Sequence, residues 1–181
     1  MATQPIPSAS WALFARDVLA AAVLHADQES VPAPRDVSLP HGGVFVTLHK
    51  HRRLRGCMGT LDADVPLAEA VRRATLSAAF HDPRFPPVAS PELAELDLEV
   101  SVLSHPEPMH DLAELVIGRH GVLVRRGPQR GLFLPQVAAE HHLDRETFVS
   151  RCCDEKAGLP ADAWRQPDTE VLLFTTEVFR A

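Results

Sequence analysis

The chain has 181 residues, of which 45% are hydrophobic and 23% charged, so it can bury one sizeable core but not two large independent ones. Its formal net charge of −6 excludes the basic excess that a general nucleic-acid-binding protein carries. We find no apolar run of membrane-spanning length, no recognisable export signal and no even set of cysteines, so we expect a protein of the reducing cytoplasm. The cysteines and histidines lack the spacings of common metal sites, so no metal or cofactor is predicted.

Helix and strand patterns alternate along the first half of the chain. Apolar residues at helical spacing from Trp11 onward predict an N-terminal helix. Residues 43–61 alternate on either side of the basic segment 49–53, HKHRR, which is typical of a β-hairpin and its turn. A second helix is predicted over residues 66–80, and a strand over residues 96–104.

The second half shows the same order of patterns. Residues 121–135 again alternate around a basic turn and predict a second hairpin. A helix is predicted over residues 144–158, with Asp144 as its N-terminal cap and Gly158 as its C-terminal stop. Residues 169–179 then predict one closing strand.

Both halves therefore follow the order hairpin, helix, strand. This order predicts an α+β fold in which a mainly antiparallel sheet is flanked by helices, with an internal duplication of the hairpin–helix–strand unit. The alternative is that the two hairpins are similar by chance, since the two halves share little identity.

The first candidate site is the segment LRGCMG, which places Cys57 between two glycines. Gly56 and Gly59 allow a turned backbone and a close approach of other groups. Backbone amides and the adjacent Arg55 would favour the thiolate form of the cysteine, as a nucleophile requires. In the alternative interpretation Cys57 is a small buried residue that packs like any other hydrophobic side chain.

The second candidate site is the segment FHDPRF, just beyond the predicted second helix. Its His81 is a candidate base towards Cys57, with Asp82 orienting the imidazole, as in cysteine–histidine catalysis. The alternative is a structural turn in which Asp82 and Arg84 form a local ion pair.

Three polar or reactive residues lie inside predicted apolar elements. Glu99 interrupts an apolar strand, so it either points into a cleft, faces water or pairs with an arginine. Cys152 and Cys153 are adjacent in a predicted helix, where consecutive side chains point about 100° apart. We therefore expect both cysteines to be structural, one of them buried and the other partly exposed.

Two basic turns, residues 49–53 and 125–130, have equivalent places in the two hairpins. Together they would form a patch for phosphate or an acidic partner. The alternative is that they are two solvated turns that also protect the sheet edges.

The order of several motifs resembles a known family. LRGCMG closely resembles the Leu-Arg-Gly-Cys-Ile-Gly motif of the AMMECR-type domain, also called protein A of the AmmeMemoRadiSam system. GVFVTL, DPRFPP, LEVSVLS, GLFLPQVA and KAGLP are similar to family segments and occur in the same order. The resemblance covers roughly residues 8–180, and Met58 replaces the usual isoleucine with a side chain of similar volume.

The resemblance implies a single domain over residues 1–181, built from two intertwined subdomains at approximately 8–104 and 105–181. It implies that Cys57 is a catalytic nucleophile or covalent carrier and that Arg55 stabilises its thiolate or an oxyanion. The other motif positions, taken as binding residues, are Leu54, Gly56, Gly59, Asp82, Arg84, Glu99, Ser101, Gln136 and Lys156.

Members of this family resemble companions of a Memo-like dioxygenase-fold protein and a radical-SAM protein. The present chain has no cysteine cluster for radical chemistry. We therefore expect an enzyme or enzyme subunit that uses Cys57 on an unidentified small molecule or modified residue. The alternative is a non-catalytic protein- or RNA-binding module in which the motif is a recognition surface.

Overall fold

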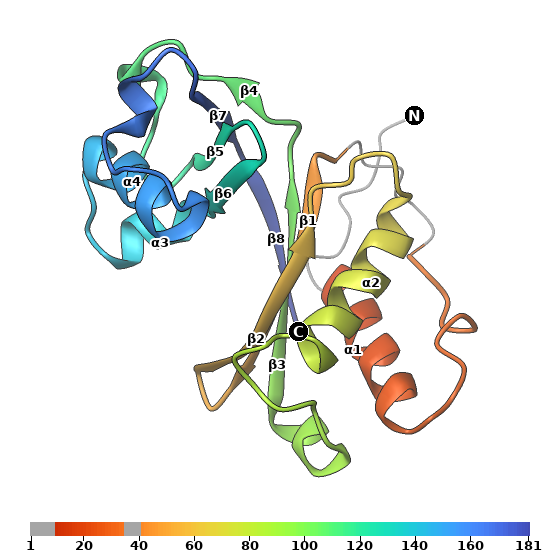
Figure 1. Ribbon diagram of the computed structural model, residues 1–181. Coiled ribbons are helices and arrows are strands. Elements are labelled where there is room, and N and C mark those ends of the chain that lie inside the picture. The colour runs from red at the N-terminus through yellow and green to blue at the C-terminus, as the bar shows by residue number, and fades with distance from the viewer. Residues whose placement is uncertain (1–9, 35–40) are drawn as a thin grey trace. The chain divides into compact units, whose positions relative to one another are not determined.

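The computed structural model describes residues 10–34 and 41–181 and confirms the α+β class. The chain forms two compact units (Figure 1). Unit 1 comprises the chain up to Val102 together with Glu177–Ala181, and unit 2 is Leu103–Thr176. Each unit has its own four-stranded sheet and its own hydrophobic core. No helix within the described ranges is long and apolar enough to span a bilayer.

Unit 1 packs two helices on one face of a sheet whose strand order is β2-β1-β3-β8 (Figure 1). The predicted helices and the predicted hairpin are confirmed, and the turn lies at the basic segment. The elements are α1 (Ser10–Val23), β1 (Gly43–Lys50), β2 (Arg53–Thr60), α2 (Leu67–Phe80), the 3₁₀ helix η1 (Ser90–Glu95), β3 (Leu96–Leu103) and β8 (Thr176–Arg180).

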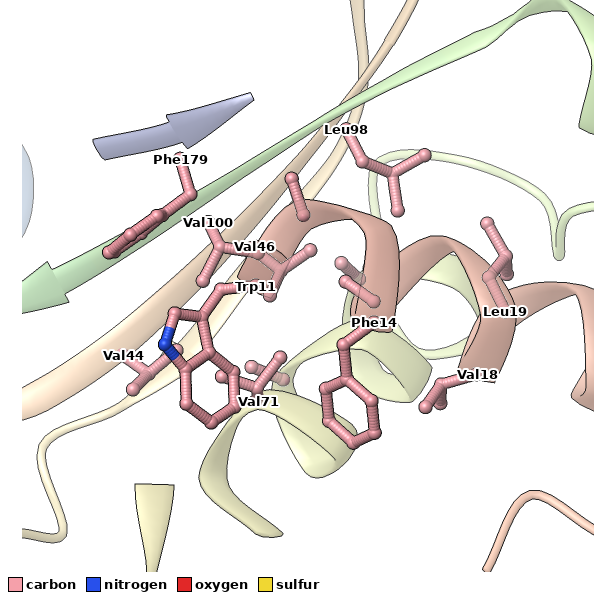
Figure 2. Close-up of a cluster of buried hydrophobic side chains, with 14 of the residues drawn as sticks. Trp11, Phe14, Val18, Leu19, Val44, Val46, Val71, Leu98, Val100 and Phe179 are labelled. Carbon is pink, nitrogen blue, oxygen red and sulfur yellow. The ribbon is translucent and has the colours of Figure 1, made fainter. Parts of the chain in front are cut away.

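The core of unit 1 fills the space between these helices and the sheet. Figure 2 shows Trp11 of α1 beside Val44 and Val46 of β1, with Phe14 in the same buried cluster. Because side chains alternate across a strand, Thr47 lies on the opposite face of the sheet, away from the helices. Cys57 pairs with Thr47 in the antiparallel hairpin and lies on that same outer face.

Unit 2 contains the second predicted hairpin, in a sheet with the order β4-β7-β5-β6. Its core includes Phe133 and Phe148, which stack with ring centroids 5.7 Å apart. Asp144 caps its helix, as predicted, by accepting a hydrogen bond from the Thr147 N–H at 2.8 Å. The elements are β4 (Glu107–Pro108), η2 (Leu112–Glu114), β5 (Gly121–Arg126), β6 (Gln129–Phe133), α3 (Pro135–Glu140), α4 (Arg145–Arg151), η3 (Cys152–Ala157), η4 (Ala163–Arg165) and β7 (Glu170–Phe174).

The predicted helix over residues 144–158 changes its winding partway. α4 ends at Arg151, and η3 continues as a π-helix that ends at Gly158 in the left-handed conformation. Cys152 and Cys153 are both fully buried, so the expected partial exposure of one is wrong. The reason is that the start of the π-helix, which carries both cysteines, is packed on two sides. The Cys152 thiol faces carbonyl groups of the sheet, and the Cys153 thiol faces the backbone of Trp164.

The predicted single closing strand is also wrong. Residues 169–179 form β7 and β8, which belong to different sheets and are separated by Thr175. The Ser104 N–H donates to the Thr175 carbonyl at 2.9 Å, and the Thr175 N–H donates to the Ser104 hydroxyl at 3.0 Å. In both units the first hairpin strand neighbours the strand that follows the helices, but internal duplication stays a prediction.

Candidate functional site

The LRGCMG segment is extended strand, so the turned backbone expected around Cys57 is wrong. It lies in β2, and neither Gly56 nor Gly59 has a positive φ. Both positions instead require glycine because neither has room for a Cβ atom. A Cβ atom on Gly56 would overlap the Ala78 carbonyl oxygen of α2, and one on Gly59 would overlap the carbonyl oxygen of Val44. The strand can therefore lie directly against α2 only with glycine at position 56.

β2 is an edge strand, and the residues that follow α2 cover its outer edge at Cys57. The Cys57 N–H donates to Oδ2 of Asp82 at 2.9 Å. The Cys57 carbonyl accepts from Nη2 of Arg84 at 3.2 Å. One acid and one base thus bind both polar groups of a single residue where a further strand would otherwise pair. We call this arrangement the Asp82–Arg84 clamp.

The clamp is held together by an ion pair, which is the alternative that the sequence left open for this segment. Arg84 donates through Nε to Oδ1 of Asp82 at 2.9 Å and through Nη2 to Oδ2 at 2.7 Å. The Arg84 side chain, followed by the N–H groups of Cys57 and Arg84, holds the pKa of Asp82 well below its usual range, although burial opposes the shift. The carboxylate is therefore bound to these donors rather than orienting His81, which is exposed at the end of α2.

The Cys57 sulfur has a hydroxyl donor and a cation close to it. Thr47 Oγ1 donates to the sulfur at 3.4 Å from across the hairpin. The Arg84 guanidinium, whose pKa Asp82 raises, is bonded to the carbonyl of the residue that carries the sulfur. Cys57 is partly exposed, whereas burial raises the pKa of Cys152 to about 12. Sequence reasoning missed Thr47, because regular counting back from the hairpin turn would place it opposite Gly56. The register shifts between Leu48 and His49, and this shift brings Thr47 opposite Cys57.

Arg55 pairs with a different carboxylate. Its Nε and Nη2 each donate to one oxygen of Glu92 in η1 at 2.9 Å. The hydrogen bonds from Arg55, and then the N–H of Ala89, lower the pKa of Glu92 to about 2. Arg55 Nη1 is buried without an acceptor among the described residues. Arg84, and not Arg55, is the arginine bonded to the Cys57 backbone, so the stabilising role assigned to Arg55 stays a prediction.

The remaining predicted residues of unit 1 lie around this centre or on its sheet. Leu54 is 41% exposed beside the motif. Glu99 accepts from Arg180 Nε at 2.8 Å, so the predicted arginine pairing is present, and it also lines an open pocket of about 550 Å³. Ser101 is buried, and its hydroxyl has no partner among the residues described.

Gln136 and Lys156 belong to unit 2. Gln136 is partly buried in α3, and Lys156 places its Nζ 5.5 Å from the centre of the Phe133 ring. Gly131 of β6 allows the backbone at Lys156 to approach closely, because a Cβ there would overlap it. In the parts of the chain that the structure describes, no three histidine, cysteine or acidic side chains are grouped to hold a metal ion.

The two basic turns make ion pairs within their own units. Lys50 lies 3.5 Å from carboxylate oxygens of Glu92 and Glu95, and His51 Nε2 lies 2.7 Å from Glu95. In unit 2, Arg125 pairs with Glu170, and Arg126 pairs with Asp168 at 3.2 Å. Part of the positive charge of each turn is therefore balanced locally.

The fold and the site define a small α+β protein with a thiol on a clamped edge strand. A family model described as AMMECR1 matches residues 12–179, so the chain belongs to the AMMECR1 family, as the motifs predicted. A protein of Thermococcus gammatolerans is 48% identical over 147 residues, covering 76% of this chain and 71% of that protein. A protein of Methanothermobacter thermautotrophicus is 47% identical over 150 residues, covering 80% and 78%. The crystal structure of an uncharacterised protein from Pyrococcus horikoshii aligns with a TM-score of 0.82 at 36% identity, covering 94% of this chain and 89% of that one.

Proposed function

We propose that the protein is an enzyme, or the subunit of one, in which the Cys57 thiol reacts with or carries a small molecule or a modified residue. The observation that carries this proposal is the Asp82–Arg84 clamp. It binds the N–H and the carbonyl of the residue that holds the thiol, and of no other residue in the motif.

Closing a strand edge with the clamp requires a buried charge, which is unfavourable in free energy. The Asp82 side chain is only 1% exposed, and burying a carboxylate is unfavourable unless it is paired and hydrogen-bonded. A lysine or a proline on the edge would protect it at less cost. Fixing the backbone of a reacting residue from both sides is, by contrast, what a catalytic thiol needs to meet its substrate in one geometry.

The thiol itself has the surroundings of a working group. It is the partly exposed cysteine of the three, it accepts a hydrogen bond from Thr47, and the Arg84 guanidinium is bonded to the carbonyl of the same residue. A donor and a cation both favour the thiolate, which is the nucleophilic form. The proposed partners remain a Memo-like protein and a radical-SAM protein, because this chain has no cysteine cluster for radical chemistry of its own.

The test is alkylation of the native protein with iodoacetamide at pH 7, followed by peptide mass spectrometry. Cys152 and Cys153 are buried internal controls in the same chain. We expect rapid modification of Cys57 and none of the two controls until the protein is unfolded in urea. Protection of Cys57 to the same degree as the controls would contradict the proposal.

A second candidate function is recognition of a partner protein by the motif surface. It is favoured by Leu54, which exposes 41% of its surface at the start of the motif. The Memo-like protein of the same organism is the binding partner to use. A recognition surface predicts that Cys57→Ala keeps the affinity and that Leu54→Ala lowers it. The opposite pattern would exclude this function.

A further inference from the structure

The outward side of the clamp has an unused hydrogen-bonding edge. Arg84 uses Nε and Nη2 to bind Asp82 and the Cys57 carbonyl. No group among the described residues accepts from Nη1. The Arg84 side chain is 50% exposed, whereas the Asp82 side chain is 1% exposed. The half-exposed Arg84 side chain therefore leaves room for a further hydrogen-bond partner beside Cys57.

The charges of the clamp are arranged with the negative end inward. The Asp82 carboxylate accepts four hydrogen bonds, from the N–H groups of Cys57 and Arg84 and from Nε and Nη2 of Arg84. Its charge is thus buried and satisfied by donors. A molecule that approaches from solvent meets the guanidinium first, so the ion pair acts locally as a positive surface.

The guanidinium is also held in one orientation before any ligand arrives. Asp82 binds it through two nitrogens, the Cys57 carbonyl fixes Nη2, and its central carbon lies 5.5 Å from the centre of the Phe85 ring. A planar arginine fixed in this way loses little side-chain entropy on binding an oxyanion. Its donors suit the oxygens of a carboxylate or a phosphate.

We propose that Arg84 is the anion-binding group of the site, and that the small molecule acted on at Cys57 carries a carboxylate or phosphate group next to its reacting atom. Nη1 takes an oxygen of that group and holds the reacting atom over the sulfur. This inference rests on the proposed function of Cys57 and names the class of its substrate.

The test compares two alkylating reagents of the same size and leaving group, iodoacetate, which is anionic, and iodoacetamide, which is neutral. The ratio of their rate constants at Cys57 is measured in the folded protein and in urea. We expect the folded ratio to exceed the unfolded one by about fivefold, which corresponds to one charge at contact distance in water. Arg84→Gln should return the ratio to the unfolded value, and Arg84→Lys should keep part of the increase.

The matched control is Arg73→Gln. Arg73 is 62% exposed on α2, where it pairs with Glu69, so this variant changes the net charge without touching the clamp. It should leave the ratio unchanged. A measurement on the unmutated protein covers the case in which Arg84→Gln does not fold. Raising the salt concentration should slow iodoacetate and leave iodoacetamide unaffected, since salt screens an exposed charge.

Competition then identifies the anion. Inorganic phosphate and acetate are added separately, and the one that slows iodoacetate at Cys57 at the lower concentration names the preferred group. A folded ratio equal to the unfolded ratio, with both reagents still reacting, would overturn the role of Arg84 and leave the proposed function of Cys57 standing. Failure of both reagents to modify Cys57 before unfolding would overturn the two together.

Discussion

The Arg55–Glu92 ion pair makes the stability of unit 1 sensitive to acid. Glu92 has a pKa of about 2 in the folded protein, against an ordinary value of 4.5, because Arg55 donates to both of its oxygens. A carboxyl group whose pKa is lowered by folding stabilises the protein above its unfolded pKa, and that stability is lost as the pH falls towards the folded pKa. The shift of 4.5 − 2 = 2.5 units corresponds to about 3 kcal/mol at pH 7, of which about 2 kcal/mol is lost by pH 3.

The assay is urea unfolding of the parent protein and of Glu92→Gln between pH 7 and pH 3. Trp11 lies in unit 1 and Trp164 in unit 2, so a Trp164→Phe background makes the fluorescence specific for unit 1. We expect Glu92→Gln to lower the free energy of unfolding by about 3 kcal/mol at pH 7 and by clearly less at pH 3. A difference between the two proteins that stays constant over this range would refute the reasoning, because the loss would then be one of packing and not of charge.

Two further predictions concern the motif strand. Gly56→Ala places a methyl group against the Ala78 carbonyl of α2, so we expect unit 1 to lose about 1–3 kcal/mol in urea unfolding. An unchanged urea midpoint would show that strand and helix can separate without loss. Thr47→Val keeps the shape of the side chain but removes the donor to the Cys57 sulfur, so alkylation at pH 7 should slow by about threefold to tenfold. At a pH where Cys57 is fully ionised the two proteins should react alike, and a persistent difference there would indicate a steric cause.

The hairpins and helices are visible in the sequence because each has its own local signal. Alternating apolar residues flank short basic turns in both hairpins, and Asp144 and Gly158 mark the ends of one helical segment. No such signal marks Thr175, where the chain leaves one sheet and enters the other. Residues 169–179 contain neither glycine nor proline, and their β-branched and apolar residues suit both strands equally. The π-helix is hidden for a similar reason, since its composition continues that of α4.

In the candidate site, too, a contact between residues close in sequence can be predicted, whereas contacts between distant residues cannot. The Asp82–Arg84 ion pair can be predicted because its members are two residues apart. The pair of Arg55 with Glu92 joins residues 37 positions apart, through a 3₁₀ helix that the sequence did not predict. The attachment of Asp82 to the Cys57 backbone likewise depends on how α2 packs on β2, which no local pattern records.

Unit 2 interrupts unit 1 in the sequence, and this order has a consequence for how the protein is made. During synthesis the ribosome releases every residue of unit 2 before β8, so the sheet of unit 1 lacks one strand until then. The hydrogen bonds between Ser104 and Thr175 bring the two ends of the interruption together within unit 2. Folding of unit 2 therefore closes a long loop and removes most of the entropy that β8 would otherwise lose in finding its place. A nascent chain would therefore complete the sheet of unit 1 last, at the edge opposite to β2 and Cys57.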